Sequence, residues 1–445
     1  MKAPVSPKLI AALVFVLALA AVPPSLRAGM APARTVLDNG MVLLTSEQRA
    51  LPIVSIELLI DAGARYDRAN QEGLANLTAR LLTYGSARRN ALQISDTLDF
   101  LGASLSAGCG DDLATISMSI LKKDLAVGLE LLAEILTTAS FPVAEVERQK
   151  QAVIASIQAR EEEPGDIAQR RFAALLYPQS PYGKPTEGSA AAVRRLTQRD
   201  LRDFFQRHYR PNRTIMSVVG DVSQAEISRA LTQALRGWNK GEPGGPPVAP
   251  AQVGGKQAVR VNKDLTQANI ILGHQGVGRE NPDYYAIQVM NYILGGGDFS
   301  SRAMETIRNQ KGLAYSVYSY FSPEKNWGTF QFVLQTKNES ALEAVRLAEA
   351  EMRRMREELV SEQELSDAKD FLTGSFPLRF DTNRKVANFL ASVEYYQLGL
   401  DYPQNYYGLI QKVARADVQR VAQKYLLPDK LITVIVGNQG KIGGN

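Results

Sequence analysis

The chain carries one segment twice: DLRDFFQRHYRPNRTIMSVVGD at residues 200–221 and DVQRVAQKYLLPDKLITVIVGN at residues 417–438. The two copies align without a gap, so that Pro211 falls on Pro428. Each copy has the pattern of a helix, a proline turn and a strand rich in β-branched residues. Because the copies also share a glycine at the same offset, chance similarity between two such units is a weak explanation. The repeat therefore predicts two homologous halves.

A second correspondence supports the duplication, although it needs small gaps. Residues 101–104, followed by a strand at 114–120, match residues 311–314, followed by a strand at 328–334. Both copies have the same order of a loop and an alternating strand, which again predicts that the halves share one fold.

A stretch rich in proline and glycine separates the two halves. Residues 241–255 read GEPGGPPVAPAQVGG, a composition that cannot support a regular element and predicts an extended linker. The expected organisation is an N-terminal domain at 29–240, this linker, and a C-terminal domain at 256–445.

Within each half, strand and helix patterns come in mixed order. Asn39-Gly40 predicts a two-residue hairpin, and residues 53–60 continue as a strand. Residues 72–84 are amphipathic at helical spacing, and residues 144–162 form a long helical pattern that ends before a proline. The predicted fold class is α+β, with each half a mostly antiparallel sheet that has helices packed on one face.

The N-terminus has the layout of a secretory signal peptide. Lys2 and Lys8 precede an apolar run at residues 9–22, which is followed by prolines and small residues. The run is shorter than the roughly 20 residues that cross a bilayer, so we expect removal of residues 1–28 rather than a permanent membrane span. If the source is bacterial, the expected location is the periplasm.

Charge and cysteine content argue against a nucleic-acid-binding protein and against a disulfide-stabilised one. The formal net charge is +5, but basic and acidic residues are interspersed, which argues against nucleic-acid binding. Cys109 is the single cysteine, so no internal disulfide can form and stability must come from packing. We expect Cys109 to be a packed thiol rather than a nucleophile.

The segment RYDRANQEGLANLTARLLTYGSARRN at residues 65–90 resembles the first helix of the pitrilysin, insulinase and mitochondrial processing peptidase family of zinc metallopeptidases, the inverzincins. Active members carry H-x-x-E-H there, because positions i and i+4 lie on one helix face and hold one ion while the glutamate activates water. Matching the flanking residues places Asn76, Ala79 and Arg80 at these positions. None of the three can perform the family's chemistry, since an amide, a methyl group and a permanent cation replace the two histidines and the glutamate.

The third zinc ligand of the family is also missing. It is a glutamate on a later helix, and the corresponding stretch at residues 147–157 places Ser156, or its neighbour Ala155, at that position. The only histidines, His208 and His274, lie one in each half and are expected to be a helix-end and a strand residue. The resemblance therefore implies no metal or other cofactor in this chain and zinc in a partner subunit.

The second half keeps the other diagnostic segment of the same family. Residues 291–320, NYILGGGDFSSRAMETIRNQKGLAYSVYSY, resemble its glycine-rich loop, helix and G-L-A-Y strand. In the family an arginine and a tyrosine seven residues apart contact the substrate and polarise its scissile carbonyl, and they match Arg308 and Tyr315. The first half has Leu98 and Leu105 at the corresponding positions, so this chemistry is confined to the second half.

Local signals support this transfer more weakly. Asp298 or Ser300 could cap a helix that runs to about Gln310, and Gly312 could end it in a left-handed turn. The reversal would bring the two donors together, as electrostatic stabilisation of an oxyanion requires. The alternative is an arginine that satisfies helix-end carbonyls and a tyrosine that fills a strand.

The leading hypothesis is a non-catalytic subunit of a heterodimeric zinc metallopeptidase. A zinc-bearing homologue would supply metal and general base, and this chain would supply Arg308, Tyr315 and half of a clamshell chamber for extended peptides. One alternative is a purely structural or peptide-binding pseudo-peptidase, as the family's respiratory-complex core subunits allow. A second is an independent hydrolase that uses Cys109, for which no histidine lies nearby in the sequence.

Overall fold

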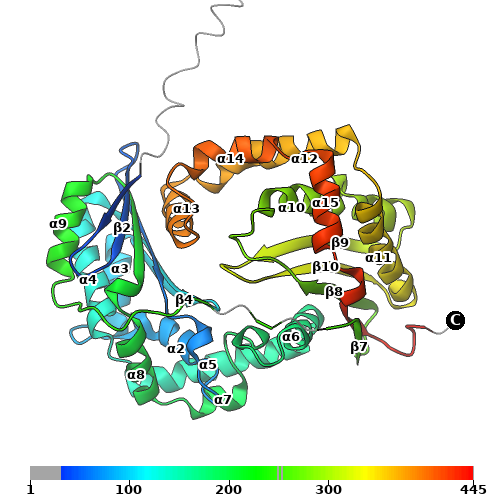
Figure 1. Ribbon diagram of the computed structural model, residues 1–445. Helices are drawn as coiled ribbons and strands as arrows, with labels where there is room; N and C mark the ends of the chain where they lie inside the picture. Colours follow the sequence, from blue (N-terminus) through cyan, green and yellow to red (C-terminus); the bar gives the residue numbers. More distant parts are fainter. Residues whose placement is uncertain (1–31, 248–249, 252–253, 444–445) are drawn as a thin grey trace, which may run out of the picture.

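The computed structural model describes residues 32–247, 250–251 and 254–443. Figure 1 shows two halves, each a sheet with its own helices, joined by the chain in between. The predicted signal peptide at 1–28 lies outside the described residues. Within the described ranges no single helix has the length and apolar composition for crossing a membrane, whereas the pair Lys122–Thr138 and Val143–Glu162, bent by 88°, meets those criteria together.

The first half is built on a six-stranded sheet with the order β1-β2-β6-β3-β5-β4. Its strands β2 and β6 are parallel and its other neighbours are antiparallel. The strands are β1 (Ala33–Val36), β2 (Val42–Glu47), β3 (Ile53–Ile60), β4 (Ser104–Cys109), β5 (Ala114–Leu121) and β6 (Thr214–Gly220). The helices of this half are α2 (Leu74–Leu81), α3 (Ala91–Leu101), α4 (Leu125–Thr138), α5 (Val143–Glu162), α6 (Pro164–Leu176), α7 (Ala190–Arg195), α8 (Gln198–His208) and α9 (Gln224–Ala234). Short 3-10 turns are η2 (Ala64–Tyr66), η3 (Leu82–Tyr84), η4 (Lys122–Asp124), η5 (Pro181–Gly183) and η6 (Pro211–Arg213).

The second half is built on a five-stranded sheet with the order β7-β11-β8-β10-β9. The strands are β7 (Gln257–Asn262), β8 (Gln267–Gln275), β9 (Ala314–Pro323), β10 (Gly328–Lys337) and β11 (Ile432–Gly437). The helices are α10 (Tyr284–Asn291), α11 (Ala341–Glu357), α12 (Glu362–Ser375), α13 (Asn383–Tyr395), α14 (Tyr402–Gln411) and α15 (Arg415–Tyr425). Two π-helical segments are η7 (Tyr292–Gly296) and η9 (Met304–Gln310), and the 3-10 turns are η8 (Asp298–Ser300), η10 (Asn338–Ser340), η11 (Phe376–Arg379) and η12 (Pro428–Lys430).

The predicted duplication is confirmed element by element. The order β2-β6-β3-β5-β4 in the first sheet repeats as β7-β11-β8-β10-β9 in the second, and β7 and β11 are again parallel. The repeated segment is α8, η6 and β6 in one copy and α15, η12 and β11 in the other. The α+β class with mostly antiparallel sheets is thereby confirmed.

The first hairpin differs from the prediction in its loop length. The N–H of Leu37 donates to the Met41 oxygen at 2.9 Å, so the loop inside this last hydrogen-bonded pair has three residues, not two. Gly40 has φ of +83°, whereas Asn39 is not left-handed. A two-residue type I′ turn requires positive φ at both central residues, so the chain instead forms a three-residue loop with glycine in the left-handed position.

On one face, each sheet packs against helices of its own half to form a hydrophobic core. In the first half this core joins the strands to α2, α4, α5 and α8 through residues that include Leu43, Ile56, Ile116, Met216, Leu77, Leu132, Ile154 and Phe204. The second half has an equivalent core beneath α10, α11 and α15. Burial of such side chains contributes about 1.5–3 kcal/mol each, which fixes the register of the strands.

One helix of each half packs on the sheet of the other half. Figure 1 shows α6 beside the second sheet and α13 beside the first. Phe172 of α6 belongs to a cluster with Ile271 and Val434 of the second sheet, and Leu390 of α13 belongs to a cluster with Val219 of the first. The halves are therefore interlocked by exchanged helices rather than merely joined by the linker.

A glycine makes room for the first of these helices. A Cβ atom on Gly273 of β8 would lie 2.5 Å from the ring of Phe172 and 2.4 Å from the backbone oxygen of Phe330. Both distances are below van der Waals contact, so a larger residue would push α6 off the sheet.

Candidate functional site

Helix α2 carries the positions at which the sequence predicts a degenerate zinc motif. Leu74, Leu77 and Leu81 are buried and hold the helix on the first sheet. The carboxylate of Asp67 accepts hydrogen bonds from the N–H groups of Gly73 (2.7 Å) and Ala75 (2.9 Å), which satisfies free donors of the first turn. Burial raises the pKa of Asp67 to about 7.

The side chains at the motif positions differ in exposure. Asn76 is half-buried, Ala79 is fully buried and Arg80 is exposed. Ser156 is exposed on α5, which packs against α2. An amide, a methyl group, a guanidinium and a hydroxyl are not a zinc donor set, because zinc sites use imidazole, thiolate and carboxylate ligands. These residues therefore do not fit the metal that active members of the family hold.

The two histidines are structural residues in the described chain. His208 ends α8 and lies between Tyr66 and Phe204, with ring centroids 4.5 Å away in each case. Burial, together with nearby arginines, lowers the pKa of His208 to about 3, so the ring is neutral. The Nδ1 of His274 donates to the Gln275 oxygen at 2.7 Å, and its Nε2 accepts the N–H of Leu427 at 3.1 Å.

No cluster of three or more histidine, cysteine, aspartate or glutamate side chains with metal-ligating geometry occurs among the residues that the structure describes. Cys109 packs at the margin of the first core, where its Sγ lies 3.2 Å from the Gly110 oxygen. Burial raises the pKa of this thiol. A protonated thiol in such surroundings is inert, which argues against a cysteine nucleophile.

The segment that carries Arg308 is a helix that changes to π-helical geometry. Ser301 rather than Asp298 or Ser300 begins it, since the Ser301 oxygen accepts the N–H of Glu305 at 3.0 Å. The predicted cap was therefore wrong by one to three residues, because Asp298–Ser300 form a separate 3-10 turn. The predicted end is confirmed: Gly312 has φ of +63° and donates to the Arg308 oxygen at 2.9 Å.

This chain reversal brings Arg308 and Tyr315 together. The guanidinium carbon of Arg308 lies 5.9 Å from the ring centroid of Tyr315 and 5.1 Å from that of Phe299. Tyr315 is 72% exposed and Phe299 is 69% exposed. Among the described residues no carboxylate lies within ion-pair distance of Arg308, whose guanidinium contacts Met304 Sδ at 3.8 Å. The cation is thus held against aromatic faces and keeps its donors available.

Comparison with known proteins places this arrangement in a family. The family model described as Insulinase (Peptidase family M16) matches residues 42–190, and the model described as Peptidase M16 inactive domain matches residues 195–372. The chain belongs to the M16 peptidase family. The inactive-domain description of the second model supports a non-catalytic member, in line with the residues predicted at the H-x-x-E-H positions, Asn76, Ala79 and Arg80.

Relatives of this M16 chain align over nearly its whole length. An uncharacterized zinc protease of Rickettsia bellii is 26% identical over 90% of this chain and 97% of the relative. The non-peptidase homolog YmxG of Helicobacter pylori is 28% identical over 90% of this chain and 92% of the relative. The crystal structure of a peptidase M16 inactive domain from Pseudomonas fluorescens superposes with a TM-score of 0.87 at 28% identity and covers 91% of this chain and 97% of that structure.

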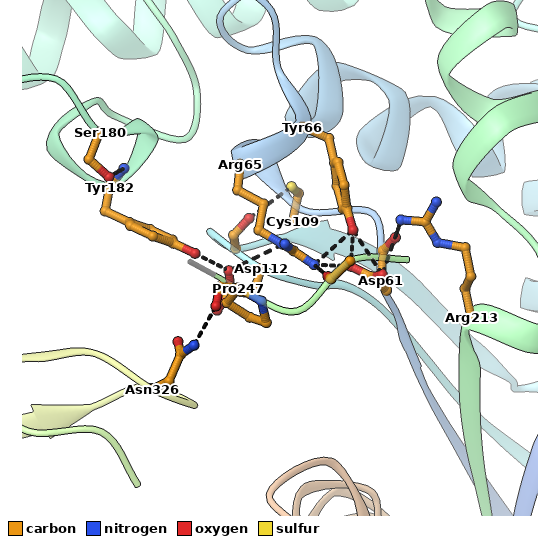
Figure 2. A network of polar contacts seen from close by, with 12 residues as sticks. Asp61, Arg65, Tyr66, Cys109, Asp112, Ser180, Tyr182, Arg213, Pro247 and Asn326 are labelled. Carbon is orange, nitrogen blue, oxygen red and sulfur yellow. Dashed lines mark hydrogen bonds and ion pairs between the residues drawn. The ribbon is translucent and has the colours of Figure 1, made fainter. Parts of the chain in front are cut away.

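The M16 fold also creates a polar junction that sequence reasoning missed. Arg65 donates to Asp61 and to the linker oxygen of Gly245, both at 2.7 Å, and lies 3.4 Å from Asp112 (Figure 2). Asp112 in turn accepts the hydroxyl of Tyr182 at 2.8 Å. The only sequence signal was that Asp61 and Asp112 lie next to strand ends, which does not show that they meet Arg65 and Tyr182.

Proposed function

We propose that this chain is a non-catalytic partner subunit of a heterodimeric zinc metallopeptidase. In this arrangement a homologue with an intact H-x-x-E-H motif supplies the metal and the general base. This chain binds and orients an extended peptide and supplies donors to the reacting carbonyl. Helix α2 has no zinc ligands at the predicted motif positions, whereas the second half keeps Arg308 and Tyr315. This combination supports a division of roles between two chains.

The observation that carries the proposal is the state of Arg308 and Tyr315. The two side chains are adjacent at 5.9 Å, and neither is engaged by a carboxylate among the described residues. A structural arginine at the end of a helix is normally engaged by carbonyls or acids. Two solvent-accessible donors, one cationic and one phenolic, instead have the chemistry that stabilises a developing oxyanion.

Edge strands support the binding of an extended peptide. Strand β4 ends the first sheet and β9 ends the second, so each has an unpaired row of backbone donors and acceptors. A peptide can add to such an edge as a further strand, with alternate side chains on each face. Tyr315 lies near the start of β9, next to the position that such a peptide would take.

The test is reconstitution with a zinc-bearing partner. A homologue with the intact motif that co-purifies with this chain should cleave peptides faster after mixing than either chain alone. The double variant Arg308→Ala with Tyr315→Phe should reduce the gain in kcat by about 10² to 10³-fold, the typical effect of removing an oxyanion donor. Arg346 and Tyr407 are exposed residues of the same half, so Arg346→Ala with Tyr407→Phe is the matched control.

The outcomes distinguish the proposal from its rival. Full activity of the Arg308 and Tyr315 variant in the complex would remove the catalytic assistance and favour a purely structural or peptide-binding pseudo-peptidase. Failure of every zinc-bearing homologue to associate would remove the heterodimer. Peptide cleavage by the isolated chain, with chelator present, would instead support an independent hydrolase.

A further inference from the structure

A cavity of about 300 Å³ lies where the two halves meet. Its walls come from α6, from the turn after it, from the tip of the β4–β5 hairpin and from strands β9 and β10. This volume is at the lower end of the range for small-molecule sites. Neither Arg308 nor Tyr315 lines the cavity, whereas Phe172 and Tyr182 do.

Aromatic side chains form much of its wall. Tyr182 stacks on Trp327 with ring centroids 4.1 Å apart, and Tyr177 meets the same indole edge-on at 5.4 Å. The hydroxyl of Tyr177 donates to the Gly328 oxygen at 2.6 Å, which fixes this ring. Phe172 and Tyr320 also line the cavity. Figure 2 shows Tyr182 beside this cavity, where its hydroxyl donates to Asp112, and Asn326 of the second half, which donates to the Pro247 oxygen nearby.

Two carboxylates line the cavity without a counter-ion. Asp111 comes from the first half and Glu324 from the second, and neither has an ion-pair partner among the described residues. Burial, reinforced by neighbouring carboxylates, raises the pKa of Asp111 to about 6 and that of Glu324 to about 7. Lys184 is the one cation among the described lining residues, and its ammonium is held by Glu72 at 2.9 Å.

A buried amide gives a second, independent sign of a missing ligand. Gln331 lines the cavity from β10 and is 3% exposed, yet its Oε1 has no hydrogen-bond partner among the described residues. Buried acceptors of this kind are nearly always satisfied, by protein, water or ligand. Gln331 lies opposite Gly273 and Tyr320 in the sheet, on the face that meets α6.

We propose that this cavity binds the primary ammonium group of a small alkylamine, held by Asp111, Glu324 and the Oε1 of Gln331, with its alkyl chain against the aromatic walls. An ammonium offers three N–H donors for the three acceptors, and its positive charge offsets one of the two uncompensated negative charges. Aromatic faces favour a cation and an apolar stem together. A bound amine would join the halves, since its two carboxylate ligands come from different sheets.

The same ammonium chemistry has two sources, a free amine or the lysine side chain of a peptide. Titration calorimetry on the full chain at pH 8, where both carboxylates are ionised, should detect binding of n-butylamine and none of n-butanol. Nα-acetyl-lysine amide serves as the peptide arm. Tighter binding of n-butylamine assigns the site to free amines, and tighter binding of the lysine derivative assigns it to peptide side chains.

Neutral variants test the assigned acceptors. Glu324→Gln with Asp111→Asn should weaken n-butylamine binding by about tenfold or more, because an ammonium loses two charge-assisted hydrogen bonds. Gln331→Leu should weaken it by a smaller factor. Glu349→Gln is the control, since Glu349 pairs with Lys256 at the surface and its loss changes net charge equally per site.

The proposal is overturned if n-butanol binds as well as n-butylamine, if neither amine binds, or if the cavity variants bind like the Glu349 control. Near-ultraviolet circular dichroism of each variant confirms that it is folded. Because every measurement uses the isolated chain, the result does not depend on any partner subunit.

Discussion

Replacement of Phe172 by alanine tests whether α6 stabilises the sheet of the opposite half. Phe172 is fully buried, and its ring lies over Gly273 of β8 in the second sheet. Ile432 of β11 pairs directly with Gly273 and is 1% exposed. The aromatic ring therefore packs in the same row of the sheet as Ile432, although the two residues belong to different halves.

The expected loss of stability follows from the burial. Truncation of a fully buried phenylalanine to alanine removes its transfer free energy and leaves a cavity, which together cost about 3–5 kcal/mol. For a cooperative unit of about 150–250 residues, each kcal/mol lowers the Tm by about 2–4 °C. We therefore expect a fall in Tm of about 6–20 °C for Phe172→Ala.

A double-mutant cycle measures which sheet is affected. The free energy of unfolding is obtained from urea titration for Phe172→Ala, Ile432→Ala and the double variant. Residues in contact show interaction energies of about 0.5–3 kcal/mol, so the two losses should not add. The matched cycle pairs Phe172→Ala with Met216→Ala, which is buried in the first-half core and should add within about 0.5 kcal/mol.

The two tryptophans provide local probes for the same cycle. Trp238 is buried in the first core, and Trp327 belongs to the cluster that contains Phe172. In a Trp238→Phe background the fluorescence transition comes from Trp327 and reports on the contact between α6 and the second sheet. Additivity of Phe172→Ala with Ile432→Ala, combined with coupling to Met216→Ala, would refute the helix exchange.

Three further changes give contrasting outcomes. Burial raises the pKa of Glu324 to about 7 from 4.5, so its stabilising contribution is complete below pH 4.5 and is lost as pH rises through 7. The free energy of unfolding of Glu324→Gln, measured with urea, should therefore rise relative to that of the unchanged protein by on the order of 1–3 kcal/mol between pH 4.5 and 8. An unchanged difference would contradict the burial of this carboxyl. Gly220→Ala should destabilise the chain by about 1–3 kcal/mol, because the new Cβ would lie 2.1 Å from the Ile53 oxygen. Gly408→Ala, in open space within α14, should instead stabilise it by about 0.5–1 kcal/mol. Equal Tm shifts of the two variants would contradict this. Elemental analysis after dialysis should find less than stoichiometric zinc, and one tightly held zinc per chain would contradict the assignment of the motif.

Much of the fold was predictable because its signals are local. The periodicity of Leu74, Leu77 and Leu81 predicted α2, and the proline at residue 164 marked the end of α5. The hairpin at Gly40 was predicted but its loop was one residue too short, since sequence does not give the φ of Asn39. The cap of the Arg308 helix was misplaced because several adjacent polar residues can each serve as a cap.

The candidate site was predictable where a motif places residues close along the chain. Arg308 and Tyr315 are joined by a short reversal at Gly312, and the structure brings them together. The cavity lined by Asp111, Glu324 and Gln331 was not predictable, because each residue is unremarkable in its own segment. No periodicity or spacing links a hairpin tip of one half to a strand of the other.

The sequence by itself determined that the chain has two homologous halves, that each half mixes strands with helices, and which residues stand at the predicted zinc-motif positions of α2. These are properties of local pattern and residue identity. The tertiary structure alone decided that α6 and α13 exchange sheets, and that carboxylates of both halves line one cavity. An amphipathic helix specifies that it must bury one face but not which sheet will cover it, because burial is non-directional and depends on the surfaces that the rest of the chain presents.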